Sequence, residues 1–277
     1  MSNPLSACRA SLGIVALVAF LSFAWRADET HSRETPARSL SAPAAGGLAS
    51  AIAGDANGWR VEVDGVAIDT KAALEFASAP GGVEDLELAR LALFADSIGR
   101  HCAREAVDWR LVAALIAEES GFDPNVMSSA GAFGLMQVKE AAAREVGVYP
   151  FEDPDSNVRA GVRYLAAMRE EFPAPTRRDR RALMLAAYNM GPGHLRDAQQ
   201  LAADFGYPAQ RWEEGVASAV LLLEQPAIHR RTKHGFAHGA SVVRYVDRVL
   251  ARYAAYRRRF PSVNMPSVAM IADIASR

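Results

Sequence analysis

The sequence is poor in cysteine and carries almost no net charge. Cys8 and Cys102 are the two cysteines among 277 residues, and Cys8 lies in a segment that reads as an export signal. A processed chain would keep one cysteine and no internal disulfide, and we expect Cys102 to be a small buried hydrophobe. The net charge of −1 and the lack of a basic arm interleaved with aromatics exclude the usual signature of a nucleic-acid-binding protein.

The sequence also lacks a long hydrophobic run. Its longest N-terminal run, Leu12 to Trp25, follows Arg9 and is shorter than the roughly 20 residues of a comfortable membrane span. It is near the upper end of a signal-peptide core, and Ser22-Phe23-Ala24 offers a small-x-small cleavage site. We predict that residues 1–27 are a signal peptide, with an uncleaved anchor as the alternative. The remainder is then exported to the periplasm, where it is free or associated with the inner or outer membrane.

Residues 28–82 form a low-complexity region in this interpretation. From 28 to about 58 the chain is rich in Ala, Ser, Gly, Pro and charge, which predicts a disordered tether. Residues 59–68 alternate apolar and polar around Asp64-Gly65, which predicts a small β-hairpin. A lone hairpin is marginally stable, so we expect it to dock on the main domain.

Helical periodicity dominates residues 83–260, and the tail from 261 to 277 has weak signals. Asp108 is the expected N-cap of a helix ending near Ser120, and Ser156 that of a later helix. The remaining helices are expected at 85–104, 138–146, 180–189, 194–203, 213–223 and 240–259. No strand-period run follows Ile68, so the predicted class is mainly α.

One acidic residue stands out on the helix that begins after Asp108. The apolar residues at 111, 112, 115 and 116 average to the direction of Glu119, whereas Glu118 points about a quarter-turn away. Burial and the negative end of a helix both raise the pKa of a carboxyl group, and Gly121 and Pro124 end the helix just beyond it. A protonated carboxyl is what general-acid catalysis needs. The alternative is a Glu119 paired with an arginine or lying at a solvated helix end.

Four segments in order then resemble the motifs of family 1 lytic transglycosylases. These are ESGFDP (119–124), SSAGAFGLMQ (128–137), AAYNMGPG (186–193) and Tyr245-Val246. The resemblance covers about residues 84–256 and implies a goose-type, lysozyme-like helical fold that cleaves peptidoglycan. The stretch 233–245 is most similar to a membrane-bound branch of this family, although this chain has no room for that branch's large N-terminal solute-binding-like domain.

The resemblance implies a chemistry that uses one carboxyl group and no cofactor. Glu119 would protonate the glycosidic oxygen between N-acetylmuramic acid and N-acetylglucosamine. The substrate's own N-acetyl carbonyl would assist, and Glu119 would then activate the 6-hydroxyl of the same sugar to give a 1,6-anhydro end. Glu118 cannot flank the same bond, because adjacent helical residues diverge by about 100°. Asp123 has no catalytic role in the family.

The same likeness nominates residues around Glu119 that bind glycan strands. Ser120 and Ser128 would line the cleft, although serine also favours helix ends and loop caps. Gly131 and Gly134 would let the backbone pass close to sugar or simply form turns.

Further nominees come from the end of the glycine loop and from two later helices. Met136 and Gln137 would form part of the cleft floor, with core packing as the alternative for Met136. Tyr188 is expected to hydrogen-bond Glu119, Asn189 to contact sugar or cap its helix, and Tyr245 to line the groove.

Two charged patterns lie outside these motifs. His229, His234 and His238 suggest a metal site, but Gly235 and Gly239 interrupt any rigid helix there, so no metal is predicted. Arginines recur in the last long helix at 244, 248 and 252, where they form a solvated face or meet the carboxylates of peptide stems.

Two other functions remain open from the sequence. One is a hydrolytic, lysozyme-type muramidase, and the other is a non-catalytic protein that binds the cell wall or serves a secretion apparatus.

Overall fold

A computed structural model describes residues 52–55, 58–63, 66–69 and 83–275. The predicted signal segment (1–27) and most of the predicted tether lie outside the described residues. Within the described part of the chain, no helix is long and apolar enough to span a membrane.

The N-terminal strands form a small antiparallel sheet. β1 (Ile52–Asp55), β2 (Gly58–Val63) and β3 (Val66–Asp69) are paired in that order, with Val63 opposite Val66. The pairing of β2 with β3 confirms the predicted hairpin. β1 corrects the extent of the tether, since it falls inside the segment expected to be disordered; its sequence, IAGD, has too few large apolar residues to show an alternating pattern.

From Val83 onward helices dominate, which confirms the mainly α prediction. They are α3 (Val83–Arg104), α4 (Trp109–Glu119), α5 (Glu140–Glu145), α6 (Pro154–Glu171), α7 (Arg177–Met190), α8 (Pro192–Asp204), a π-helical turn η1 (Trp212–Val216), α9 (Ala217–Leu222), α10 (Pro226–His229), α11 (Gly239–Arg259) and α12 (Val268–Ala275). Two-residue strands β4 (Ala132–Phe133) and β5 (Val138–Lys139) pair between α4 and α5. Strands this short show no periodicity, so the sequence could not reveal them.

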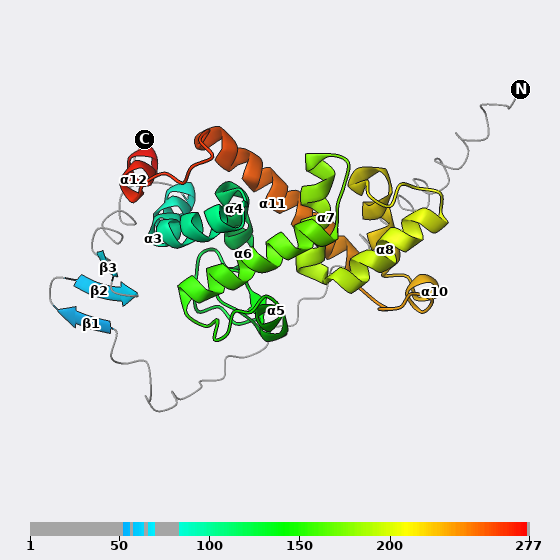
Figure 1. Ribbon diagram of the computed structural model, residues 1–277, viewed down its shortest axis with the longest axis horizontal. Helices are drawn as coiled ribbons and strands as arrows, with labels where there is room; N and C mark the ends of the chain where they lie inside the picture. Colours follow the sequence, from blue (N-terminus) through cyan, green and yellow to red (C-terminus); the bar gives the residue numbers. More distant parts are fainter. Residues whose placement is uncertain (1–51, 56–57, 64–65, 70–82, 276–277) are drawn as a thin grey trace, which may run out of the picture. The chain divides into compact units, whose positions relative to one another are not determined.

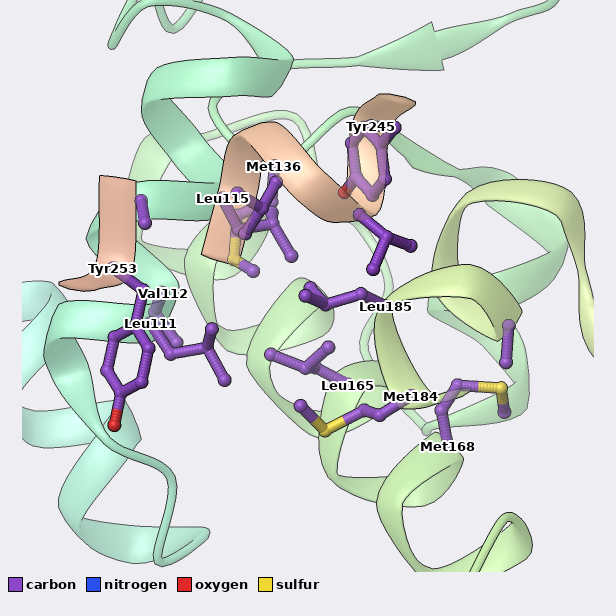
Figure 2. Close-up of a cluster of buried hydrophobic side chains, with 14 of the residues drawn as sticks. Leu111, Val112, Leu115, Met136, Leu165, Met168, Met184, Leu185, Tyr245 and Tyr253 are labelled. Carbon is purple, nitrogen blue, oxygen red and sulfur yellow. The ribbon is translucent and has the colours of Figure 1, made fainter. Parts of the chain in front are cut away.

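α4 lies at the centre of the helical part. Every residue from Trp109 to Ile116 is buried, including the charged Arg110. α3 and α11 both pack against it, and α11 also crosses α7 (Figure 1). Figure 2 shows Leu115 of α4, Leu165 of α6 and Leu185 of α7 in one buried cluster. The core therefore holds α4 against α3 and α11.

The helix ends test the predicted caps. Asp108 does cap α4, because its carboxylate accepts from the backbone N–H of Arg110 at 3.1 Å. The predicted cap at Ser156 is wrong: Asp153 caps α6 and accepts from the N–H of Ser156 at 2.9 Å. Pro154 lies in the first turn, and its φ is already set for a helix, so the helix begins earlier in the sequence than predicted.

Candidate active site

The carboxyl group of Glu119 lies in a cleft of about 320 Å³. Glu119 is the last residue of α4, and its Oε1 accepts a hydrogen bond from the hydroxyl of Tyr245 at 2.7 Å. Tyr245 comes from α11 and is 4% exposed, so this donor is held rigidly by the core. Two helices far apart in the sequence thus place the acid and its hydrogen-bond donor.

The surroundings raise the pKa of Glu119, so that a large fraction of this carboxyl group keeps its proton at neutral pH. Burial raises the pKa of Glu119 to about 7, the hydrogen bond from Tyr245 acts to lower it, and the negative charge of Glu118 raises it. Burial is the largest cause, as the apolar direction of this side chain predicted.

The neighbouring acid has a structural role. Nε and Nη2 of Arg248 both lie 2.6 Å from Oε1 of Glu118, which joins α4 to α11. Arg252, one turn further along α11, forms a similar ion pair with Glu87 of α3. These two arginines are therefore occupied by the protein's own carboxylates rather than free for peptide stems.

The predicted contact of Tyr188 with Glu119 is wrong. The hydroxyl of Tyr188 donates to the backbone carbonyl of Met136 at 2.7 Å, and Tyr245 occupies the position expected for it. Tyr188 still lines the cleft. Burial and the charge of Glu119 raise the pKa of both phenols well above the ordinary value, so both remain protonated donors. Which phenol reaches the carboxyl group depends on how α7 and α11 pack, and the spacing of residues along one helix does not determine that packing.

The two predicted serines do different things. The Ser120 hydroxyl lies 2.8 Å from the carbonyl of Leu135 and 3.2 Å from that of Ile116, so it ties the following loop to the end of α4. Of the two roles predicted for Ser120, the structure therefore supports the one at the helix end. Ser128 lines the cleft, and its Oγ accepts from the N–H of Ala132 at 3.0 Å.

A buried asparagine that sequence reasoning missed organises the loop. Oδ1 of Asn157 accepts from the N–H of Met136 at 2.9 Å, and its Nδ2 donates to the carbonyl of Phe133 at 2.9 Å. Gly134 has φ of 77°, and a Cβ there would lie 2.6 Å from this amide group. Gly134 is therefore required for close approach, whereas Gly131 (φ 75°) has open space around it and serves turn geometry. The detectable signal was an asparagine on the core face of a helix.

Met136 takes its alternative predicted role in the core, whereas Gln137 lies where it was predicted. The Met136 side chain is fully buried, and a Cβ at Gly161 would lie 2.4 Å from its sulfur, so Met136 belongs to the core rather than to the cleft floor. Gln137 does line the cleft. Its Nε2 donates to the carbonyls of Val126 (2.9 Å) and Gly134 (3.0 Å), so its amide donors hold the loop.

The rest of the cleft wall comes from the β4–β5 hairpin, α5, α6 and the end of α7. Asn189 is exposed there as predicted. The lining residues that the sequence did not single out are Ala132, Val138, Lys139, Ala142, Tyr164, Met190 and Gly191. Tyr164 and Tyr188 lie together with ring centres 5.6 Å apart. The cleft thus offers aromatic and amide groups beside one acid.

Of the three histidines considered for a metal site, His234 has a carboxylate partner. His234 of the 230–238 loop contacts Asp197 of α8 through its backbone N–H (2.7 Å) and its Nδ1 (3.1 Å). Among the residues the structure describes, no group of His, Cys, Asp or Glu could hold a metal ion.

Part of this chain, including residues of the cleft, matches a known protein family. Residues 96–209 match the family described as "Transglycosylase SLT domain". The matched residues include Glu119, the glycine loop and Tyr188.

The chain is also similar to named proteins. The chain is 39% identical over 165 residues to "Membrane-bound lytic murein transglycosylase F" of Desulfosudis oleivorans, covering 59% of this chain and 36% of the relative. It is 36% identical over 148 residues to the protein of that name from Aeromonas hydrophila, covering 53% and 30%. The chain thus spans about a third of the length of the curated relatives it matches.

Among solved structures, the chain is similar to the 70 kDa soluble lytic transglycosylase of Escherichia coli. The TM-score is 0.47 at 24% identity, covering 67% of this chain and 27% of the other.

Proposed function

We propose that this protein is a lytic murein transglycosylase that cleaves the β-1,4 bond between N-acetylmuramic acid and N-acetylglucosamine without water. One observation carries the proposal. Among the described residues that line the cleft, Glu119 is the single carboxylic acid, and its pKa is raised to about 7. Most glycosidases that hydrolyse this kind of bond use two carboxylates. The match to the family described as "Transglycosylase SLT domain" and the named relatives support the same reaction.

The chemistry follows from one acid that works twice. Glu119 gives its proton to the glycosidic oxygen as the C–O bond breaks, and the substrate's N-acetyl carbonyl oxygen supports the electron-poor anomeric carbon. The resulting carboxylate then takes the proton of the 6-hydroxyl, whose oxygen forms the new bond to the same carbon. An intramolecular nucleophile has the advantage of high effective concentration. Tyr245 holds the carboxyl in both states, since its hydroxyl donates to Oε1.

The decisive experiment replaces Glu119 and analyses the products. We expect Glu119→Gln to reduce release of muropeptides from purified sacculi by at least about a thousandfold, because the amide cannot donate the proton. Glu118→Gln is the matched control; it should stay active, since Glu118 is paired with Arg248 outside the cleft wall. Wild-type products should carry 1,6-anhydro ends, lighter by one water than reducing ends in mass spectrometry.

Other outcomes would favour the competing functions. Reducing ends from the wild type indicate a hydrolytic muramidase. A wild type that binds sacculi without cleaving them indicates a wall-binding or secretion-apparatus protein. Full activity in Glu119→Gln removes this residue from its assigned role.

We also propose that the protein acts in the periplasm, where its substrate lies, after export directed by residues 1–27. The relatives named "membrane-bound" support an association with a membrane. Fractionation of cells expressing the full chain tests this, and the proposal fails if the protein stays in the cytoplasm. Recovery in washed membranes distinguishes an anchored form from a free one.

A further inference from the structure

A second groove of about 460 Å³ lies between α7 and α11 and shares no described lining residue with the Glu119 cleft. Its buried members are Ala182, Trp212 and Tyr253. The other lining residues are Arg178, Arg181, Glu213, Asp247, Leu250, Ala251, Ala254 and Arg257. The groove is not used by the mechanism above.

Helical geometry explains why a groove forms here. Positions 247, 250, 251, 254 and 257 share one face of α11, and positions 178, 181 and 182 share one face of α7. Three of these positions are alanines, whose short side chains leave space between two helices that pack together elsewhere. Charged side chains stand at both ends of the alanine stretch on α11.

Two arginines in the groove are held by an aromatic ring. The guanidinium carbons of Arg181 and Arg257 lie 5.0 Å and 5.7 Å from the ring centre of Tyr253, within the range of cation–π attraction. The ring itself is fixed, because its hydroxyl donates to Oδ2 of Asp108 at 2.8 Å. Neither arginine forms an ion pair with any residue in the described part of the chain.

The groove also contains charges of both signs. Arg178 is neutralised by an ion pair with Glu213. Asp247 is exposed at the same groove and has no ion-pair partner among the described residues. Two guanidinium groups and one carboxylate thus line one groove without ion-pair partners among the described residues.

We propose that this groove binds the end of a peptide that carries a carboxylate beside a free ammonium group. Arg181 and Arg257 take the carboxylate, since guanidinium groups match planar anions with paired hydrogen bonds. Asp247 takes the ammonium group. Resting on the function proposed above, the ligand is the stem peptide of peptidoglycan, whose diamino acid carries a free amine next to a carboxylate.

The position of the groove suits such a role. Tyr245, which contacts Glu119, and Tyr253, in the groove, are eight residues apart on α11, or roughly 12 Å along the helix axis. A stem peptide held at Tyr253 therefore belongs to a glycan strand within reach of the cleft. The groove selects strands that carry peptides, while Glu119 acts on the sugar bond.

Binding of a stem tripeptide that ends in meso-diaminopimelate tests the proposal. We expect titration calorimetry to show at least a tenfold weaker affinity for the double variant Arg181→Gln/Arg257→Gln than for the wild type. Arg258→Gln is the matched control, because Arg258 is exposed on the same helix turn and does not line the groove. Equal affinity of the double variant and the wild type overturns the proposal.

The ammonium contact is tested separately. Asp247→Asn should weaken binding of the free tripeptide and leave binding of its side-chain N-acetylated form unchanged. If both peptides lose affinity equally, Asp247 does not recognise the amine and that part of the proposal is wrong.

Two further measurements keep this result independent of protein folding and of the proposed reaction. In the wild type, the tripeptide should shift the NMR signals of Ala251 and Ala254 rather than those around Glu119. The opposite pattern would contradict the proposal that the groove binds the peptide. Cleavage of glycan strands stripped of peptide should persist in the double variant, because the Glu119 cleft is intact. If the wild type does not cleave these strands, the transglycosylase function is contradicted, whereas the evidence for peptide binding in the groove is unchanged.

Discussion

At the scale of single residues, the site is defined by how Glu119 is kept protonated and held. Burial is the cause that dominates its raised pKa, and the Tyr245 hydroxyl is the group that opposes it. Glu118, one residue earlier, is tied to Arg248. Two adjacent glutamates therefore have opposite roles, because one faces the core and the cleft while the other faces an arginine on α11.

The hydrogen bond from Tyr245 can be tested by its effect on pH dependence. Because this bond favours the carboxylate, Tyr245→Phe should raise the pKa of Glu119 further, and the alkaline limb of the rate of glycan cleavage should move up by about one pH unit. A hydrogen bond to a charged group is worth roughly 1.5–3 kcal/mol, so kcat should fall about 10- to 100-fold. The pH–rate profile measures both changes.

Tyr188→Phe is the matched control for that variant. Its hydroxyl contacts the Met136 carbonyl, so we expect a loss of roughly 1 kcal/mol in the free energy of unfolding and an unmoved alkaline limb. A shifted limb in Tyr188→Phe alone would restore Tyr188 as the partner of Glu119.

The raised pKa also predicts how stability depends on pH. Glu119 has an ordinary pKa of 4.5 and a folded value of about 7, so the folded state binds more protons between these values. Its stabilising contribution is complete below pH 4.5 and is lost as the pH rises through 7. Between pH 4.5 and pH 8, the free energy of unfolding of the wild type should therefore fall by roughly 1–3 kcal/mol relative to that of Glu119→Gln. Urea unfolding at both pH values measures this, and parallel behaviour of the two proteins would contradict the buried acid.

At the scale of elements, the loop between α4 and α5 is shaped by α6. Asn157 binds the backbone at Met136 and Phe133, and Ser120 binds it at Leu135. The loop is thus fastened from two helices, which places Ser128 and Gln137 in the cleft wall beside Glu119.

The close approach at Gly134 gives a stability prediction. Gly134→Ala would place a methyl group 2.6 Å from Asn157 at a φ of 77°, so we expect a loss of at least about 2 kcal/mol in the free energy of unfolding together with reduced activity. Gly147→Ala is the control, since its φ is similar (69°) and nothing lies within 4 Å. Denaturant unfolding compares the two, and equal losses would show that only backbone strain matters.

At the scale of the whole molecule, a buried charged cluster joins the start of α4 to the end of α11. Arg110 is 4% exposed and donates through Nη1 to the carbonyls of Phe260 (2.9 Å) and Pro261 (3.0 Å). Its Nη2 lies 2.7 Å from Oδ2 of Asp108, which also accepts from Tyr253. Burial acts to raise the pKa of Asp108, but these hydrogen bonds hold it below the ordinary value. The cluster fixes α11, which carries Tyr245 and part of the lining of the groove at Tyr253.

Breaking this cluster should be costly. Arg110→Met leaves Asp108 without its arginine and two carbonyls without donors, so we expect a loss of roughly 3–5 kcal/mol in the free energy of unfolding. Arg163→Met is the control at a more exposed ion pair with Glu105, where about 1 kcal/mol or less is expected. Equal effects in guanidinium unfolding would contradict the structural role of Arg110.

Local patterns in the sequence determined the helical class, the Asp108 cap, the hairpin pairing and the placement of Glu119, because each depends on residues within a turn or two. Tertiary packing alone decided that Tyr245 rather than Tyr188 holds the acid, which of its two predicted roles Met136 takes, and that Asn157 fastens the loop. It also decided that the groove at Tyr253 exists. These depend on the rotation and distance of helices far apart in the chain, which the periodicity of one helix does not encode.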